Sequence, residues 1–106
     1  MAIRHVVLFS FKPATDADLI RRLIDELNAL PSIIGEINEW TIVEDVGKRD
    51  YAAQFALIAS FDSLEAVNRY LAHPAHVRVV EQALPWIDQL LEHDHPLPSA
   101  RATKGA

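Results

Sequence analysis

The stretch from residue 52 to residue 76, AAQFALIASFDSLEAVNRYLAHPAH, decides the fold. Its first part, residues 52–61, carries apolar side chains on both of the faces that a strand would present. That pattern is typical of a strand that is covered on both sides. The second part of the stretch has helical character with a proline in its middle, so the chain turns from strand to helix to helix within 25 residues.

The two helices of this stretch are delimited by recognisable start signals. Asp62, with Glu65 three residues later, predicts a capping-box-like start for a helix over residues 63–72. Pro74 cannot continue that helix, and it pushes His73 out of the helical region of backbone space. With His73 as N-cap and Pro74 at the first helical position, a further helix of about ten residues is expected.

The chain before this stretch reads as strand, helix and strand. Residues 2–11 alternate between two largely apolar faces, which predicts a strand covered on both sides. Leucines and isoleucines at helical spacing predict an amphipathic helix over about residues 16–30, with Thr15 as its N-cap. A second strand is expected over about residues 36–44, and the polar segment 45–50 is expected to be an exposed loop.

The chain after the helices is ambiguous. We interpret the second half of residues 86–95 as a fourth strand, although a helix fits these residues nearly as well. Residues 97–106 look like a flexible C-terminal tail, so residues 1–96 form the expected domain. The order β-α-β-β-α-α-β predicts an α+β, ferredoxin-like fold with a four-stranded antiparallel sheet and its helices on one face.

The predicted sheet has a second face that the helices do not cover. In such folds that face is ordinarily polar, but here the first and third predicted strands carry apolar residues on both faces. An identical sheet is the simplest cover for it. We therefore expect a homodimer in which two sheets meet through their faces and close into a dimeric α/β barrel.

Composition excludes several classes of function. The 106 residues carry a net charge of −5, which argues against binding nucleic acid or an anionic membrane surface. There is no cysteine, so disulfides, thiolate nucleophiles and cysteine metal sites are absent. No signal peptide or membrane span is expected, and a cytoplasmic protein is the default expectation.

One run of residues has the character of a reactive site. Residues 70–76, YLAHPAH, place a phenol and two imidazoles around the break between the two helices. That corner can bring the Tyr70 and His76 side chains toward one space, where a proton could pass between them and a ligand. A structural reading stays open, in which Tyr70 is a core-edge residue and His76 bonds a backbone carbonyl.

These residues resemble a known family. His5 in the first strand, the corner at residues 61–63, Tyr70, and His73-Pro74-Ala75-His76 look like the stress-responsive α/β-barrel (Dabb) domain. The resemblance covers about residues 1–96, and it implies a dimeric ferredoxin-like barrel. The family includes plant heat-stable stress proteins and a polyketide cyclase, olivetolic acid cyclase, that closes a linear tetraketide by aldol condensation.

The resemblance to the cyclase implies roles for individual residues. The cyclase's catalytic tyrosine and histidine match Tyr70 and His76, and its strand-one histidine matches His5. A further cyclase histidine, on the third strand, aligns near Phe55. The resemblance thus implies catalysis by Tyr70 and His76, and substrate binding by His5, Phe55 and Tyr70. The expected chemistry is acid–base chemistry on a small carbonyl compound, as in a cyclase or lyase, with no cofactor and no metal.

Two other functions stay open at this point. The protein could be a non-enzymatic stress-associated dimer or a carrier of a small molecule, and it could be a cofactor-free monooxygenase-like barrel. His5 could equally be a core histidine that has found a hydrogen-bond partner. In a strand, His93 and His95 would share one face and Asp94 the other, but no third metal ligand is evident near them.

Overall fold

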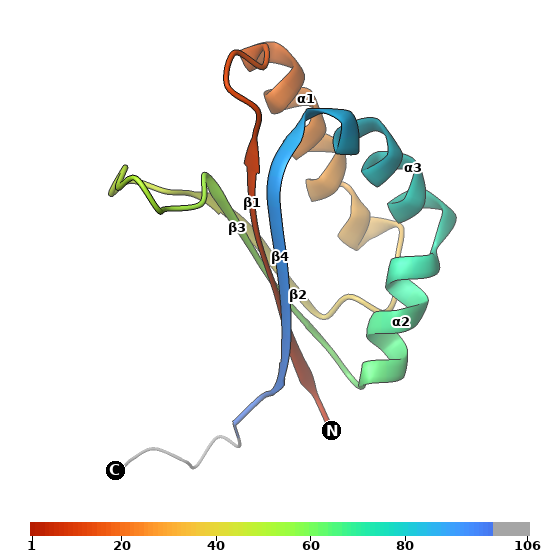
Figure 1. Ribbon diagram of the computed structural model, residues 1–106. Coiled ribbons are helices and arrows are strands. Elements are labelled where there is room, and N and C mark those ends of the chain that lie inside the picture. Colours follow the sequence, from red (N-terminus) through yellow and green to blue (C-terminus); the bar gives the residue numbers. More distant parts are fainter. Residues whose placement is uncertain (99–106) are drawn as a thin grey trace.

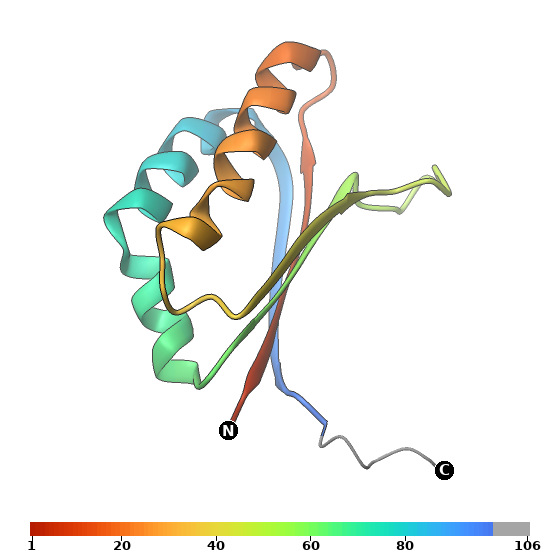
Figure 2. The same cartoon turned by 180° about the vertical axis from the view of Figure 1, so that it is seen from behind.

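The computed structural model describes residues 1–98 and has the ferredoxin-like fold expected from the sequence (Figure 1). Its elements are β1 (Ile3–Phe11), α1 (Ala17–Asn28), a 3₁₀ helix (Leu30–Ser32), β2 (Glu39–Glu44), β3 (Phe55–Phe61), α2 (Leu64–Ala72), α3 (Pro74–Ala83), a 3₁₀ helix (Leu84–Trp86) and β4 (Ile87–Pro96). The strands form one antiparallel sheet in the order β2-β3-β1-β4. All three α-helices lie on one face of this sheet, as Figures 1 and 2 show from opposite sides. The predicted tail beyond residue 98 lies outside the described residues.

The strands differ from their predicted bounds at their ends. β2 begins at Glu39 rather than near residue 36, and β3 begins at Phe55 rather than at residue 52. In the region that is ambiguous by sequence, residues 86–95, Trp86 ends a 3₁₀ helix and all residues from Ile87 on form a strand, so the helical alternative is wrong. β4 pairs with β1 from Ile3 opposite Pro96 to Phe11 opposite Ile87, with one irregularity near its start. Pairing with the central strand β1 thus determines that this segment is a strand, which its own sequence pattern does not determine.

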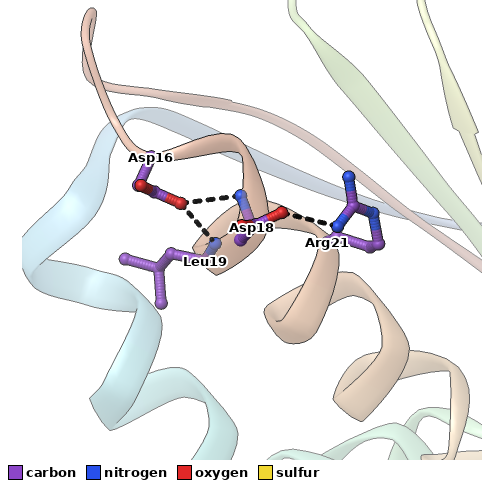
Figure 3. Close-up of polar contacts among 4 residues, drawn as sticks. All are labelled: Asp16, Asp18, Leu19 and Arg21. Carbon is purple, nitrogen blue, oxygen red and sulfur yellow. Dashed lines mark hydrogen bonds and ion pairs between the residues drawn. The ribbon is translucent and has the colours of Figure 1, made fainter.

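The N-cap of α1 is Asp16, and the prediction of Thr15 is wrong by one residue (Figure 3). The Asp16 carboxylate accepts hydrogen bonds from the backbone N–H groups of Asp18 at 2.8 Å and Leu19 at 3.2 Å. The Thr15 hydroxyl instead donates to the carbonyl oxygen of Lys12, 2.6 Å away, and closes the preceding turn. That bond turns the Thr15 side chain toward Lys12, so it belongs to the turn, and the helix cap is supplied by Asp16.

The same one-residue shift occurs at α2. Ser63 is the N-cap, and its hydroxyl oxygen accepts from the backbone N–H of Ala66 at 3.1 Å. Asp62, the predicted cap, accepts from the side-chain amide of Asn38 at 2.8 Å and so ties the end of β3 to the start of β2. At α3 the prediction is confirmed: His73 is the N-cap and Pro74 occupies the first turn.

The face of the sheet that the helices cover, called here the inner face, holds the hydrophobic core. Phe9 and Phe11 from β1 and Leu57 and Phe61 from β3 are buried there against the helices. Helical residues such as Leu23 complete the core with no exposed surface. Alternate residues of each strand point to this face, as the period of a strand requires.

The opposite face, called here the outer face, is covered by no element of residues 1–98. The strand register arranges its side chains into three rows that cross all four strands. The rows are Val43, Ala56, Leu8, Leu91; then Thr41, Ile58, Val6, His93; then Glu39, Ser60, Arg4, His95. The first row is apolar and the third is polar, with an ion pair of 3.2 Å between Arg4 and Glu39.

The apolar row is largely open to solvent. Leu8, Val43 and Leu91 keep 39%, 50% and 68% of their surface exposed. The loop between β2 and β3 extends from the sheet on this same side, away from the helices (Figures 1 and 2). None of the described helices is long and apolar enough to cross a membrane.

Candidate functional site

Tyr70 occupies the centre of the space between the helices and the inner face. It lies on α2 and is 1% exposed. Aromatic rings surround it, with ring centroids 5.0 Å away at Phe61, 5.9 Å at His5 and 6.0 Å at Trp40. No fully buried side-chain oxygen or nitrogen among residues 1–98 lacks a hydrogen-bond partner. No hydrogen bond within these residues engages the Tyr70 hydroxyl, so this hydroxyl cannot be one of the fully buried polar atoms. It is therefore accessible from the cavity that Tyr70 lines.

Burial raises the pKa of Tyr70 well above its ordinary value of 10.0, and the negative charge of Glu92 raises it further. The phenol therefore stays protonated throughout the physiological range. A group in that state can donate a hydrogen bond to an oxygen that gains negative charge.

His76 faces Tyr70 from the first turn of α3, with the ring centroids 4.5 Å apart. The break at His73 and Pro74 creates this juxtaposition. His73 has extended backbone angles, and its Nδ1 accepts from the backbone N–H of Ala75 at 3.0 Å. Because the helix axis changes there, the side chain three residues later points back toward α2.

The protonation state of His76 follows from its partner. Its Nδ1 lies 3.0 Å from the carbonyl oxygen of Leu71, which can only accept, so Nδ1 carries the hydrogen. In the neutral ring Nε2 then holds a free lone pair. Burial lowers the pKa of His76 below its ordinary value of 6.5, although the bond to Leu71 and the charge of Glu92 act in the opposite direction. The ring is thus neutral near pH 7 and able to accept a proton.

His5 is a buried histidine with a partner. It is 1% exposed, and its Nδ1 lies 2.6 Å from the Asp94 carboxylate on the neighbouring strand β4. The carboxylate fixes the orientation of the ring between Phe61 and Tyr70. Hydrogen bonding to a carboxylate satisfies one ring nitrogen of a buried imidazole.

These three side chains line one cavity of about 130 Å³ between the sheet and the helices. Most of its wall is apolar and comes from β1, α1, α3 and β4. The polar side chains that line it are His5, Tyr70, His76 and Glu92. The cavity thus combines an apolar wall with a proton donor, a neutral imidazole and a carboxylate.

Phe55, the fourth residue implied by the family resemblance, does not line this cavity. It is buried in the core and stacks on Phe9 with ring centroids 5.4 Å apart. The structure therefore brings Tyr70, His76 and His5 together and leaves Phe55 apart from them.

Glu92 is the cavity residue that sequence reasoning missed. It is two residues away from both Leu90 and Asp94, so all three side chains share the inner face when β4 is a strand. The ambiguity between helix and strand in this segment concealed that signal. By the same alternation His93 and His95 lie on the outer face, with ring centroids 5.2 Å apart, and Asp94 points the other way as predicted. Within residues 1–98 no three potential metal-binding side chains converge.

Comparisons with known proteins agree on one family. The family model of the Stress Responsive A/B Barrel Domain (Dabb) matches residues 3–97. The stress-response A/B barrel domain-containing protein HS1 of Arabidopsis thaliana is 32% identical over 95 residues, which are 88% of this chain and 87% of that protein.

Solved structures agree in fold. A dimeric ferredoxin-like protein of unknown function from Thermobifida fusca superimposes with a TM-score of 0.81 at 26% identity, covering 92% of each chain. Hydroxynitrile lyase from Passiflora edulis superimposes with a TM-score of 0.83 over 92% of this chain and 94% of that one. Its identity of 19% makes this a likeness of fold alone.

Proposed function

The chain belongs to the stress-responsive A/B barrel domain family, and we propose that it is a homodimeric, cofactor-independent enzyme that acts on a small carbonyl compound. The observation that carries the proposal is the cavity in which a neutral imidazole and a protonated phenol face each other. The proposed chemistry is proton removal next to a carbonyl group, as in a cyclase or lyase.

In this proposal His76 is the base. Its Nε2 lone pair accepts the proton while Nδ1 stays bonded to the Leu71 carbonyl, which holds the ring in one tautomer and one orientation. Tyr70 is the donor: its phenol stabilises the oxygen of the forming enolate. His5, fixed by Asp94, shapes the end of the cavity beside Tyr70. Proton transfer between side chains and substrate needs no further group.

A fold neighbour is compatible with this chemistry. A hydroxynitrile lyase, as its name states, acts on a molecule that carries a hydroxyl group and a nitrile group. Likeness of fold does not transfer a reaction. It supports only the statement that a protein of this fold can be a lyase.

The proposed dimer is supported by the outer face. A second copy of the chain that covered the apolar row would bury the exposed side chains of Leu8, Val43 and Leu91. A two-fold axis parallel to the strands would place apolar row against apolar row and polar row against polar row. The Thermobifida fusca protein of the same fold is dimeric.

The experiment that tests the catalytic proposal is hydrogen–deuterium exchange of cyclopentanone in heavy water, followed by proton NMR. This exchange reports removal of a proton next to a carbonyl, whatever the natural substrate is. We expect the protein to accelerate the exchange over buffer. His76→Asn keeps a donor for the Leu71 carbonyl but removes the Nε2 base, and it should lower the acceleration by about 100-fold or more.

Matched controls separate chemistry from folding. Tyr70→Phe removes only the hydroxyl and should lower the acceleration by about tenfold or more. His73→Asn retains a helix cap, and Tyr51→Phe changes a tyrosine that is 87% exposed; both should leave the exchange rate unchanged. No acceleration by the wild type, or equal rates in all four variants, would contradict the proposal.

A second candidate is a non-enzymatic carrier or stress-associated dimer. The hydrogen bond from His76 to Leu71 favours it, since that bond alone gives the histidine a structural role. A carrier would bind a small ketone at the cavity without accelerating exchange, and His76→Asn would bind it equally well.

A further inference from the structure

Glu92 stands at the open side of the cavity. It lies on β4, one of the two edge strands of the sheet, opposite Val7 in the register with β1. It is exposed and lines the cavity at the same time, so it stands where the cavity meets solvent. Leu84 and Leu90, which also line the cavity and are 53% and 43% exposed, accompany it there.

The charges around the cavity are one-sided. No lysine or arginine is among the described residues that line it, and Glu92 is its one acidic lining residue. His5 already faces the carboxylate of Asp94. His76, the remaining imidazole, donates its Nδ1 hydrogen to a backbone carbonyl and presents only a lone pair. A ligand in the cavity thus meets the Glu92 carboxylate and no lysine or arginine that would offset its charge.

We propose that Glu92 determines specificity at this site: it excludes carboxylates and other anions and admits uncharged ligands that have an apolar body and a hydroxyl or carbonyl group. The inference rests on the proposed function, because it concerns the same cavity. An anion in the cavity would lose its hydration and be repelled by Glu92. An uncharged ligand loses little hydration free energy when it enters a cavity with an apolar wall.

The size of the cavity narrows the class further. At about 130 Å³ it is close to a cavity of roughly 150 Å³ that holds benzene. The apolar body of the ligand is therefore about one ring in size. Its polar group would lie toward Tyr70 and His76, which come from the helices, with Glu92 across from them on β4.

The test uses benzamide and benzoate, two molecules of nearly equal shape that differ in charge. Binding of each is measured near pH 7 by NMR titration of the methyl signals of Val7 and Val79, both of which line the cavity. We expect the wild type to bind benzamide at least about tenfold more tightly than benzoate. Glu92→Gln keeps the shape of the side chain, and it should abolish most of that preference by improving benzoate binding.

The matched control is Asp88→Asn, which removes one negative charge from an exposed residue of the same strand that does not line the cavity. It should keep the wild-type preference. Equal binding of both probes by the wild type, or an unchanged preference in Glu92→Gln, would overturn the role of Glu92 and leave the proposed function standing. Binding of neither probe would overturn both, because the cavity would then not accept ligands of this class.

Discussion

The two faces of the sheet are built from alternate residues of the same strands, yet they differ in kind. On the inner face Phe9, Leu57 and Phe61 are buried against helices of the same chain. On the outer face Leu8 and Leu91 occupy one cross-strand row and remain substantially exposed. Helices of the same chain cover the inner face, whereas no element of residues 1–98 covers the apolar row of the outer face.

The difference extends to the polar groups. The inner face holds His5, paired with Asp94, and it presents Glu92 toward Tyr70 and His76. Of the three rows on the outer face, one is apolar and one is polar, and the row between them combines Val6 and Ile58 with Thr41 and His93. Because side chains alternate between the two sides of a strand, the same strands can carry both the proposed reactive cavity on one side and the proposed dimer surface on the other.

The largest expected effect is on the inner face. Leu57→Ala removes a side chain that is 3% exposed and leaves a cavity, so it should lower the free energy of unfolding by about 2–5 kcal/mol. Its neighbour Ile58 lies on the outer face and is only half-buried. Ile58→Ala should cost the isolated protomer less than about 1.5 kcal/mol. Urea unfolding at low protein concentration measures both, and equal losses would contradict the assignment of the two faces.

The next effect is on association. Ile58→Asp places a charge in the middle row of the outer face, and it should raise the dimer dissociation constant by about 100-fold or more while the protomer stays folded. Sedimentation velocity over a dilution series checks this. Leu64→Asp makes the same kind of change at a residue of α2 that is 50% exposed on the helical side, and it should leave the dimer intact.

A smaller effect concerns the buried histidine of the inner face. Asp94→Ala leaves Nδ1 of His5 without its partner and should cost about 1–3 kcal/mol of stability. Asp88→Ala, the same change at an exposed residue of β4, should cost less than about 0.5 kcal/mol. Chemical denaturation of both variants provides the comparison. A negligible loss in Asp94→Ala would mean that the pair does not stabilise the fold.

The smallest effect is a pH dependence. Burial sets the pKa of His76 below 6.5 in the folded protein, so the unfolded chain takes up a proton first as the pH falls. The stability contribution is fully present above about pH 6.5 and is lost as the pH falls through the lower folded pKa. His76→Asn should therefore lose less stability than the wild type between neutral pH and pH 5. If His73→Asn shows the same flattening, the effect does not belong to His76.

The sequence was sufficient for the fold because its strands and helices carry strong periodic patterns. It misplaced two helix starts by one residue, since Thr15 and Asp62 have hydrogen-bond partners outside the helices that their neighbours cap. It could not settle the segment after Pro85, because Ile87, Leu90 and Leu91 fit either period. Only the pairing of β4 with β1 resolves that choice.

For the candidate site too, local sequence patterns predicted some of the residues that come together but not those that depend on strand pairing. The corner at Pro74 predicted that Tyr70 and His76 would approach each other, and their rings lie 4.5 Å apart. Glu92 escaped notice because its face depends on β4 being a strand. The tertiary contacts of Phe55, which stacks on Phe9, are not visible in any local pattern.

The most direct test of the two-face account is one methyl NMR experiment on adjacent residues. Val7 and Leu57 lie on the inner face and Val6 and Ile58 on the outer face. We predict that adding benzamide shifts the Val7 and Leu57 signals and leaves the outer pair nearly unchanged. We also predict that dilution shifts only the Val6 and Ile58 signals. If ligand and dilution move the same methyl groups, the two faces do not have separate tasks and the account is contradicted.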